Sequence, residues 1–446
     1  MAAASQDLPA DLPVIRVRDL SRHVGERVVL RGWLWNQRGK GRLWFLLLRD
    51  GSGIVQCVVK RDAVGDDCFE AARSLTQESS FSVWGEVRAD ERARGGHELV
   101  VEGLTVHQRA EGYPITPKEH GVGFLLDHRH LWIRSRRQAA LLRVRHRVAM
   151  AMREWLDAQG FVCVDAPIFT PNACEGTSTL FEVDYFGRPA YLSQSGQLYE
   201  EAAAMALGRV YSFGPTFRAE KSKTRRHLTE FWMLEPEIAF ADLDEVCATA
   251  EGMVRHVLRE VVDRCEADLA DLERDPDDVL AWDRPWPRLR YHDVARQLVA
   301  WQEEERYQSE FTPGDDLGAP DETVLGEEYG CPVFVTHWPA EVKAFYMKRD
   351  PEDPSLALAL DVIAPVAGEI VGGSVREEDE AELRRRIREH DLPEESFEWY
   401  LDLRRFGSVP HGGFGIGLER TVSWITGVEH VRECIPFPRT IQRLTP

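Results

Sequence analysis

The chain has 446 residues, a formal net charge of −20 and 43% hydrophobic residues. This length exceeds that of a typical single domain, so we expect two or three domains with a substantial apolar core. The acidic balance excludes a protein that coats nucleic acid through its overall charge, although it allows local basic patches.

Signals for targeting and for disulfide bonding are few. The N-terminus lacks a basic stretch followed by an apolar run, and no apolar run is long enough to cross a membrane. The eight cysteines include no CxxC pair. We therefore expect buried, reduced thiols and a cytoplasmic protein.

The first part of the chain predicts a small β-barrel. Residues 1–12 read as a loose tail, and between residues 14 and 106 short β-rich runs alternate with turns such as RDGSG. One helix is expected at DDCFEAARSL, residues 66–75. Five strands and one helix in about 100 residues are typical of the oligonucleotide-binding (OB) fold, which we assign to residues 13–109.

A hinge rich in proline and glycine is expected at residues 110–137, followed by a long amphipathic helix. Leu141, Val144, Val148 and Met152 repeat at helical spacing there. The many arginines of this region, residues 129–153, are either a solvated helix face or contacts to a phosphate backbone.

The remainder, residues 138–446, predicts an α+β domain with a largely antiparallel sheet flanked by helices, because strands and helices mix without a regular βαβ rhythm. A long helix is expected over 242–269, and the acidic, proline-broken stretch 266–330 is interpreted as an insertion. Neither a GxGxxG nor a GxxxxGK(S/T) phosphate loop occurs, so a nucleotide site would have to be built from side chains on the sheet.

Three stretches in this domain carry a family resemblance: GFVCVDAPIF with Pro167, FRAEKSKTRRHLTEF (217–231) and GGFGIGLER (412–420). In this order they resemble the three signature motifs of the class II aminoacyl-tRNA synthetases. With the barrel in front, the chain resembles the aspartyl, asparaginyl and lysyl subgroup over residues 14–446. The resemblance implies an anticodon-binding barrel, a class II catalytic domain using ATP and tRNA, and a homodimer with Pro167 in its interface.

The chemistry of amino-acid activation matches the basic second motif. A carboxylate attacks the α-phosphate of ATP, so the site must stabilise converging negative charge and needs no general base. Arg218 suits this task because a guanidinium stays charged. The resemblance implies that Phe231 and Arg420 stack on the two faces of adenine, that Arg420 reaches the γ-phosphate and that His227 lies near the terminal phosphates. Glu220 either accepts from the adenine amine or contacts the tRNA end; an incidentally basic hairpin is the alternative for the whole motif.

A metal site is suggested by Asp361 and Glu369, which flank a turn in LDVIAPVAGEIVGG. Carboxylate oxygens beside phosphate suit Mg²⁺. The resemblance implies that this pair holds the ion, although two carboxylates alone mean little among 75 acidic residues.

The amino acid is indicated by polar residues that differ from the aspartyl pattern. Glu200 stands where aspartyl enzymes resembling this chain carry a lysine for the substrate carboxylate. A carboxamide needs an acceptor and a donor, for which we assign Glu235 and Arg376; the alternative for Glu235 is a structural partner of a neighbouring arginine. Gln197 and Glu175 are assigned to the α-amino and α-carboxylate ends. Asparagine is therefore the expected substrate.

Anticodon recognition is expected on the barrel. By resemblance Phe45 stacks on a base and Gln56 hydrogen-bonds one, with Arg31, Trp33 and Arg38 as neighbours. Alternatively, Phe45 belongs to a strand that merely alternates between core and surface.

The expected function is ATP-dependent ligation of L-asparagine to tRNA(Asn), with Mg²⁺. The alternatives are an aspartyl enzyme with relaxed specificity, an asparagine synthetase of the same fold, and a non-catalytic nucleic-acid-binding protein. The barrel disfavours the synthetase, and the presence of Arg218, Glu369 and Arg420 disfavours the non-catalytic protein.

Overall fold

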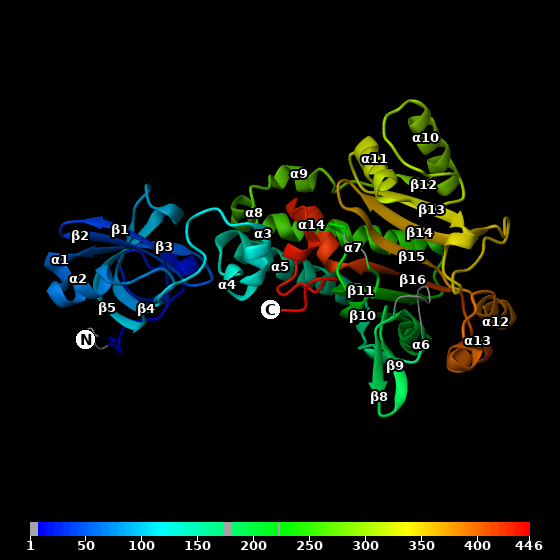
Figure 1. Ribbon diagram of the computed structural model, residues 1–446, viewed down its shortest axis with the longest axis horizontal. Coiled ribbons are helices and arrows are strands. Elements are labelled where there is room, and N and C mark those ends of the chain that lie inside the picture. The colour runs from blue at the N-terminus through cyan, green and yellow to red at the C-terminus, as the bar shows by residue number, and fades with distance from the viewer. Residues whose placement is uncertain (1–7, 173–179, 222–223) are drawn as a thin grey trace. The chain divides into compact units, whose positions relative to one another are not determined.

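The computed structural model describes residues 8–172, 180–221 and 224–446. The chain divides into two compact units, Met1–Leu125 and Leu126–Pro446 (Figure 1). Within the described ranges, no helix is both long and apolar enough to cross a membrane. The seven cysteines in those ranges are free thiols, and all but Cys163 are buried.

The first unit is a closed five-stranded barrel with strand order β1-β2-β3-β5-β4. Its interior is filled by alternate strand residues such as Val28, Leu30, Leu46 and Leu48. The predicted OB fold is thereby confirmed, and its helix is α2. The elements are η1 (Val17–Arg22), β1 (Arg27–Lys40), β2 (Leu43–Arg49), β3 (Ile54–Lys60), α1 (Arg61–Val64), α2 (Asp66–Arg73), β4 (Ser80–Ala89), η2 (Arg94–Gly96) and β5 (His97–Gln108).

The second unit is built on an eight-stranded sheet of order β12-β13-β14-β15-β16-β11-β10-β6. Adjacent strands are antiparallel except for the parallel pairs β6–β10 and β12–β13. A small sheet, β7-β9-β8, lies apart from it. The strands are β6 (Val162–Cys163), β7 (Phe169–Thr170), β8 (Glu182–Tyr185), β9 (Arg188–Leu192), β10 (Arg209–Phe217), β11 (Glu230–Ala239), β12 (Arg288–Arg290), β13 (Val333–Pro339), β14 (Leu356–Ala364), β15 (Gly368–Val375) and β16 (His411–Gly417).

Helices cover this sheet, and two of the longest begin at side-chain caps. Ser135 accepts from the Gln138 amide at the start of α5, and Asp242 accepts from the Glu245 amide at the start of α7. The helices are α3 (Val122–Asp127), α4 (Arg129–Trp132), α5 (Arg136–Ala158), α6 (Gln197–Leu207), α7 (Leu243–Arg264), α8 (Glu266–Asp271), α9 (Pro276–Leu280), α10 (Tyr291–Glu303), α11 (Ala319–Tyr329), η3 (Ala340–Val342), α12 (Glu380–Glu389), η4 (Glu394–Phe397), α13 (Glu398–Arg405), α14 (Leu418–Thr426) and η5 (Val431–Glu433).

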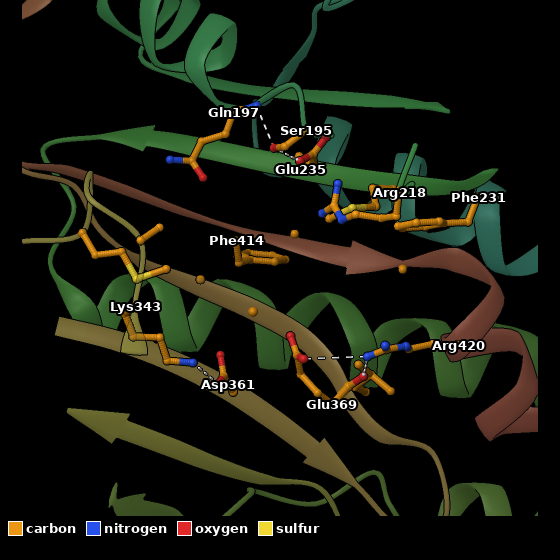
Figure 2. Close-up of a pocket in the computed structure, with 18 of the residues that line it drawn as sticks. Ser195, Gln197, Arg218, Phe231, Glu235, Lys343, Asp361, Glu369, Phe414 and Arg420 are labelled. Atoms are coloured by element: carbon orange, nitrogen blue, oxygen red, sulfur yellow. Dashed lines mark hydrogen bonds and ion pairs between the residues drawn. The ribbon is translucent and has the colours of Figure 1, made fainter. Parts of the chain in front are cut away.

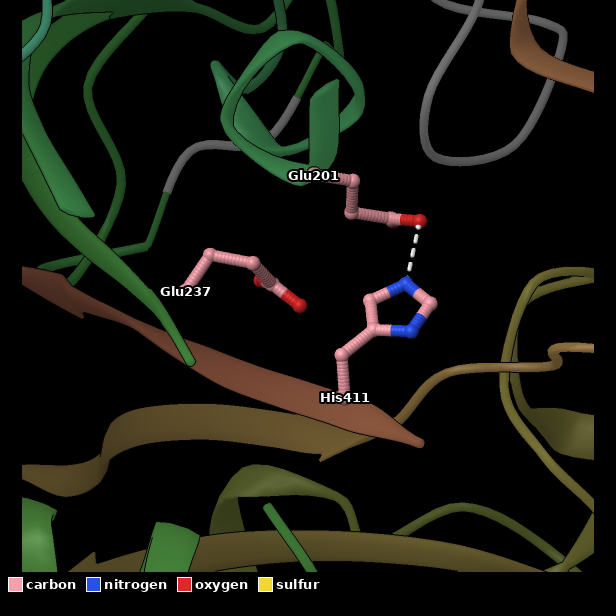
Figure 3. A group of neighbouring side chains, drawn as sticks. All are labelled: Glu201, Glu237 and His411. Carbon is pink, nitrogen blue, oxygen red and sulfur yellow. Dashed lines mark hydrogen bonds and ion pairs between the residues drawn. The ribbon is translucent and has the colours of Figure 1, made fainter. Parts of the chain in front are cut away.

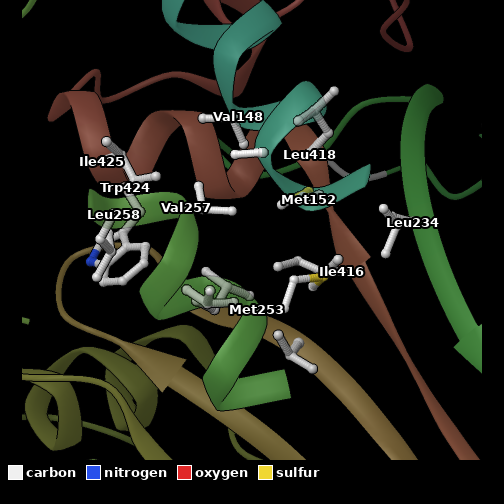
Figure 4. Packing of buried hydrophobic residues seen from close by; sticks show 14 of the residues in the cluster. Val148, Met152, Leu234, Met253, Val257, Leu258, Ile416, Leu418, Trp424 and Ile425 are labelled. Carbon is white, nitrogen blue, oxygen red and sulfur yellow. The ribbon is translucent and has the colours of Figure 1, made fainter. Parts of the chain in front are cut away.

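The main core lies between one face of the sheet and helices α5, α7 and α14 (Figure 4). Strand β11 shows how the two faces of the sheet are divided. Leu234 and Ile238 pack in the core, whereas Met233, Glu235 and Glu237 face the other way and line a cavity. The period of two therefore gives the sheet one apolar face and one chemically active face.

The arginines of α5 serve a purpose that neither sequence interpretation foresaw. Four of them form ion pairs within the unit rather than a purely solvated face or a phosphate contact: Arg136 and Arg143 fix the helix to α8, Arg145 fixes it to α14, and Arg147 pairs within α5. The pairs are Arg136–Asp271, Arg143–Asp268, Arg145–Glu419 and Arg147–Glu154.

The stretch 266–330, interpreted as an insertion, is integrated into the second unit. Strand β12 forms an edge of the main sheet, and Leu269 and Val279 are part of the main core. Helices α10 and α11 pack with β13 and β14 in a second core. Some of the prolines and acidic residues that suggested a break occupy helix starts: Asp275 caps α9, and Pro276 and Pro320 lie in the first two positions of α9 and α11.

Candidate active site

The cavity on the active face of the sheet has a volume of about 580 Å³. It collects every predicted catalytic, nucleotide, amino-acid and metal residue except Glu175, which lies outside the described residues. Those it brings together are Gln197, Arg218, Glu220, His227, Phe231, Glu235, Asp361, Glu369, Arg376 and Arg420. Residues from four strands, β11, β14, β15 and β16, together with α6, α14 and the adjoining loops therefore form one site.

Arg218 and Phe231 are neighbours because they lie at the end of the β10–β11 hairpin where the connecting loop joins the two strands. The Arg218 amide donates to the Thr229 carbonyl at 3.0 Å, and its guanidinium lies 5.6 Å from the centre of the Phe231 ring. Its Nη1 donates to the carbonyl oxygen of Gln194. A flat ring and a fixed cation are thus presented side by side, as stacking on a base next to a phosphate requires.

Arg420 and Glu369 face this pair across the cavity (Figure 2). Arg420 lies in the first turn of α14, and its Nη1 donates to the Glu369 carbonyl oxygen at 2.7 Å. Burial and the charge of Arg420 lower the pKa of His227, so its ring is neutral at neutral pH. The two guanidiniums predicted to clasp a nucleotide therefore line one cavity from opposite walls.

The carboxylates of Asp361 and Glu369 face the same point. A Cβ added to Gly372 would lie 2.7 Å from Glu369 Oε1 and 3.5 Å from Asp361 Oδ1, so the bare glycine keeps the space between them open. Lys343 donates to Asp361 Oδ2 at 2.7 Å. Burial and Glu369 nevertheless raise the pKa of Asp361 to about 7, against the opposing effect of Lys343. A divalent cation would relieve this crowding of carboxylates, and the oxygen donors suit Mg²⁺.

The basic loop after β10 is tied to the opposite side of the cavity by Arg226. Its Nη1 donates to Glu322 Oε2 at 2.8 Å, and its Nη2 donates to the Val366 carbonyl at 2.7 Å. Burial and the charge of Glu369 raise the pKa of Glu322 to about 7. The loop is therefore anchored to α11 and to the turn between β14 and β15.

At the end of the cavity predicted to bind the amino acid, Glu235 and Arg376 have separate partners within the protein. Glu235 accepts from the Ser195 hydroxyl and, at 2.9 Å, from the Gly196 amide. Arg376 instead forms a buried bidentate pair with Glu237: Nε and Nη2 donate to Oε1 and Oε2, each at 3.0 Å. Glu235 and Glu237 both face the cavity, so the strand pattern alone could not select the partner.

Gly413 makes the Glu237–Arg376 pair sterically possible. It lies opposite Glu237 on β11 and opposite Ser374 on β15. A Cβ at Gly413 would lie 2.2 Å from Glu237 Oε2, a distance no carbon can occupy. The third motif thus leaves room for an acidic side chain that the sequence did not single out.

Glu200 is fully buried behind the amino-acid end. Burial, Glu235 and Glu237 raise its pKa to about 8, so it is neutral at neutral pH. Neither of its oxygens has a hydrogen-bond partner among the residues that the structure describes. It therefore supplies no positive charge and little negative charge where a lysine was expected in the aspartyl pattern.

On the barrel, Phe45 and Trp44 take opposite sides of β2. Trp44 packs against the barrel core, and its Nε1 donates to Gln37 Oε1 at 2.7 Å. Phe45 pairs across the strands with Arg38, whose guanidinium lies 5.6 Å from its ring centre. Arg38 also donates to Gln56 Oε1 at 3.4 Å. Phe45, Arg38 and Gln56 therefore meet on the barrel surface.

Two other predicted barrel residues lie on β1. Arg31 is exposed and pairs in register with Ser82 on β4. Trp33 is 40% exposed, and the guanidinium of Arg49 lies 5.0 Å from its ring centre. Like Phe45, Trp33 presents an aromatic ring at the surface.

Comparison with known proteins agrees with both units. Residues 122–441 match the family of class II tRNA synthetases (D, K and N), and residues 28–106 match the OB-fold nucleic acid binding domain. An asparagine–tRNA ligase from Sorangium cellulosum is 55% identical over 444 residues, which are 98% of this chain and 100% of that protein. The chain belongs to the asparagine–tRNA ligase family. A Koribacter versatilis ligase of the same name is 53% identical over 97% of this chain and 99% of its own length.

Solved members of the asparagine–tRNA ligase family share the fold throughout. The crystal structure of the Pyrococcus horikoshii asparaginyl-tRNA synthetase complexed with asparaginyl-adenylate matches with a TM-score of 0.92 at 44% identity. The match covers 97% of this chain and 99% of that one. The predicted class II resemblance is confirmed.

Four residues of the cavity region were missed by the sequence-based prediction: Arg226, Glu237, Glu322 and Lys343. Arg226 lies within the basic motif and Glu237 two residues beyond Glu235, so local pattern could have nominated both. Lys343 and Glu322 stand in segments without a distinguishing pattern. Only packing places the Lys343 ammonium 3.7 Å from the centre of the Trp338 ring and beside Asp361.

Proposed function

We propose that the cavity holds ATP and L-asparagine together, so that the asparagine carboxylate attacks the α-phosphate. A carboxylate–phosphorus bond forms, the bond to the bridging oxygen breaks, and pyrophosphate leaves with that oxygen. The 3′-hydroxyl of tRNA(Asn) then attacks the activated carbonyl and releases AMP. The observation that carries this proposal is that Arg218 and Arg420, distant in sequence, line one cavity from opposite walls.

The nucleotide is assigned to the end of the cavity near Phe231. In this assignment Phe231 and Arg420 stack on the two faces of adenine, and Arg218 neutralises charge on the α-phosphate as the reaction proceeds. The neutral ring of His227 faces the terminal phosphates, and Glu220 accepts from the adenine amine or contacts the tRNA end. These roles are supported by the pairing of ring and cation at Phe231 and Arg218.

Asp361 and Glu369 would hold Mg²⁺, which when bound would neutralise phosphate charge. The carboxylates that face each other over Gly372, and the raised pKa of Asp361, support this assignment. Lys343 adds a fixed positive charge at the same place.

Selection of asparagine over aspartate follows from charge balance. Glu237 already neutralises Arg376, so Arg376 can donate to a carboxamide oxygen without offering net charge to a carboxylate. Glu200 supplies no cation, and Glu235 and Glu237 repel a second carboxylate. Gln197, and Glu175 by resemblance, are assigned to the backbone ends of the amino acid. An aspartyl enzyme with relaxed specificity is the competing reading.

The barrel is proposed to bind the anticodon through Phe45, Gln56 and Arg31, as its exposed aromatic and basic surface supports. A homodimer is proposed through the region of Pro167. Apolar side chains stand exposed nearby and on the small sheet, including Ile168 (41%) and Phe186 (89%). We place the protein in the cytoplasm, where tRNA is charged and free thiols persist.

Amino-acid-dependent exchange of pyrophosphate into ATP, measured without tRNA, tests the proposal. We expect exchange with asparagine and far less with aspartate. Robust aspartate-dependent exchange would favour the aspartyl reading. Exchange with neither would leave a non-catalytic nucleic-acid-binding protein.

A further inference from the structure

A buried group of charged side chains lies directly behind the amino-acid end of the cavity. Glu201, on α6, is fully buried, and its neighbours include Glu237 and His411 (Figure 3). Arg404 Nη2 donates to Glu201 Oε2 at 2.7 Å, and the Tyr400 hydroxyl lies 2.7 Å from both carboxylate oxygens. A carboxylate removed from water is therefore surrounded by donors.

His411 adds a further donor to Glu201. Its Nε2 lies 3.0 Å from Glu201 Oε2, and its Nδ1 lies 2.8 Å from the Val409 carbonyl oxygen. Because an ionised carboxylate only accepts, the Nε2–H of His411 donates to Glu201.

A metal ion does not account for this group. Glu201, Glu237 and His411 lie close enough together to suggest one. However, both oxygens of Glu237 accept from Arg376, both ring nitrogens of His411 are engaged, and Glu201 is paired with Arg404. Two guanidiniums at the site would repel a cation. The described side chains pair with one another instead.

Glu237 of this group lines the cavity directly, and Glu201 is connected to the cavity by a hydrogen bond. Gln197, which lines the cavity, donates from Nε2 to Glu201 Oε1 at 3.0 Å. The two ends of a carboxamide differ, since its nitrogen only donates and its oxygen only accepts. An ionised carboxylate only accepts, so Glu201 holds the amide nitrogen of Gln197 toward itself. The amide oxygen of Gln197 is then left to accept from a ligand (Figure 2).

The environment keeps Glu201 in the form that this orientation requires. Burial alone would raise the pKa of Glu201, but Arg404 and His411 outweigh burial and hold it well below its ordinary value. A protonated Glu201 could donate to Gln197 and permit the amide to turn over. The turned amide would present its NH₂ to the ammonium group of an amino acid, which can accept nothing.

We propose that Glu201 is a positioning residue for amino-acid binding: held ionised by Tyr400, Arg404 and His411, it fixes Gln197 with its oxygen toward the α-ammonium group. The inference rests on the proposed function, because it assumes that Gln197 binds the amino acid. Glu201 itself lies behind Gln197 and need not contact the substrate. Its effect is therefore expected in amino-acid affinity and not in ATP affinity.

Glu201→Gln replaces one carboxylate oxygen by an NH₂ group of similar size and removes the charge. Its effect is measured in pyrophosphate exchange without tRNA. We expect the KM for asparagine to rise at least about tenfold, the order expected when a hydrogen bond to a charged group is lost. The KM for ATP should stay within about twofold. Glu78→Gln is the matched control: Glu78 forms a buried pair with Arg49 at 2.9 Å in the barrel, and its loss should leave both KM values unchanged.

A double-mutant cycle with Gln197→Met separates positioning from general support of the fold. If Glu201 acts through Gln197, adding Glu201→Gln to Gln197→Met should change the KM for asparagine little further. Additive effects, or equal rises in both KM values, would overturn the proposal. If Glu201→Gln does not fold, Tyr400→Phe removes one donor and should give a smaller rise in the same KM; no rise there would also overturn it. Absence of exchange in the unmodified protein would instead refute the proposed function.

Discussion

Arg376 and Glu237 form a side-on ion pair in which both side chains are at most 3% exposed. The pair places a guanidinium at the amino-acid end of the cavity with its charge already balanced. A buried guanidinium with no counter-charge would favour a substrate carboxylate, whereas the neutralised one favours a carboxamide. In our proposal, specificity is thereby linked to a residue that need not touch the amino acid.

Replacing Glu237 by Gln should shift selectivity toward aspartate. The change leaves the positive charge of Arg376 without its counter-charge, and it removes one carboxylate that repels aspartate. We expect the ratio of aspartate-dependent to asparagine-dependent exchange to rise about tenfold or more. Loss of the buried pair should also lower the melting temperature, as breaking such pairs costs about 3–5 kcal/mol. An unchanged ratio with a lowered melting temperature would show that the pair is structural only.

Replacing Arg218 by Ala should abolish adenylate formation without unfolding the protein. The guanidinium is the fixed charge assigned to the α-phosphate, and loss of one such group typically costs about 10²- to 10³-fold in kcat. Arg209→Ala is a control at the other end of β10, the strand that Arg218 follows: Arg209 forms a solvent-exposed pair with Glu245, so its loss should cost at most about 1 kcal/mol in stability. Exchange retained in Arg218→Ala would exclude the assigned role.

Replacing Phe45 by Ala should weaken tRNA charging and spare tRNA-independent exchange. One lost stacking contact is expected to cost about 1–3 kcal/mol, seen as a rise in the KM for tRNA. Leu43→Ala, at the exposed start of the same strand, is the control that removes apolar surface without a ring. Equal effects of the two changes would argue that Phe45 is ordinary strand surface.

Replacing Glu200 by Gln should alter how stability depends on pH. The folded-state pKa of about 8 lies above the usual value for Glu, so the native state holds an extra proton between about pH 4.5 and pH 8. Stability then falls across this window as pH rises, because ionisation of the buried carboxyl becomes favourable only on unfolding. The Gln variant lacks this loss, so its melting temperature should exceed that of the unmodified protein increasingly toward pH 8. Parallel melting curves at all pH values would contradict the assignment.

The barrel and the long helices could be predicted because each carries a local signal. Strand residues such as Leu46 and Leu48 alternate with surface positions, and α5 shows its apolar stripe at Val144 and Val148. The motif residues Arg218 and Arg420 could be predicted for the same reason, as each stands in a recognisable stretch of sequence.

The rest depended on contacts between distant segments. Whether Glu235 or Glu237 holds Arg376 is decided by the packing of three strands, not by the residues of β11 alone. Arg226 and Glu322 are 96 residues apart, and nothing near either indicates the other. The stretch 266–330 is interpreted as an insertion from its prolines and acidic residues, but Pro276 and Pro320 stand in the first turns of α9 and α11 and do not break the fold there.

Gly413 gives the third motif, residues 412–420, a second structural role. The same short segment ends in Arg420, which meets the nucleotide in our proposal, and begins with a vacancy that only hydrogen can fill beside Glu237. A methyl group at that position would lie 2.2 Å from both Glu237 Oε2 and the Pro236 carbonyl oxygen, so it would displace the acidic partner of Arg376 and strand β11 together. Redesign of substrate preference could therefore start at Gly413, where the absence of a side chain leaves the space that Glu237 occupies.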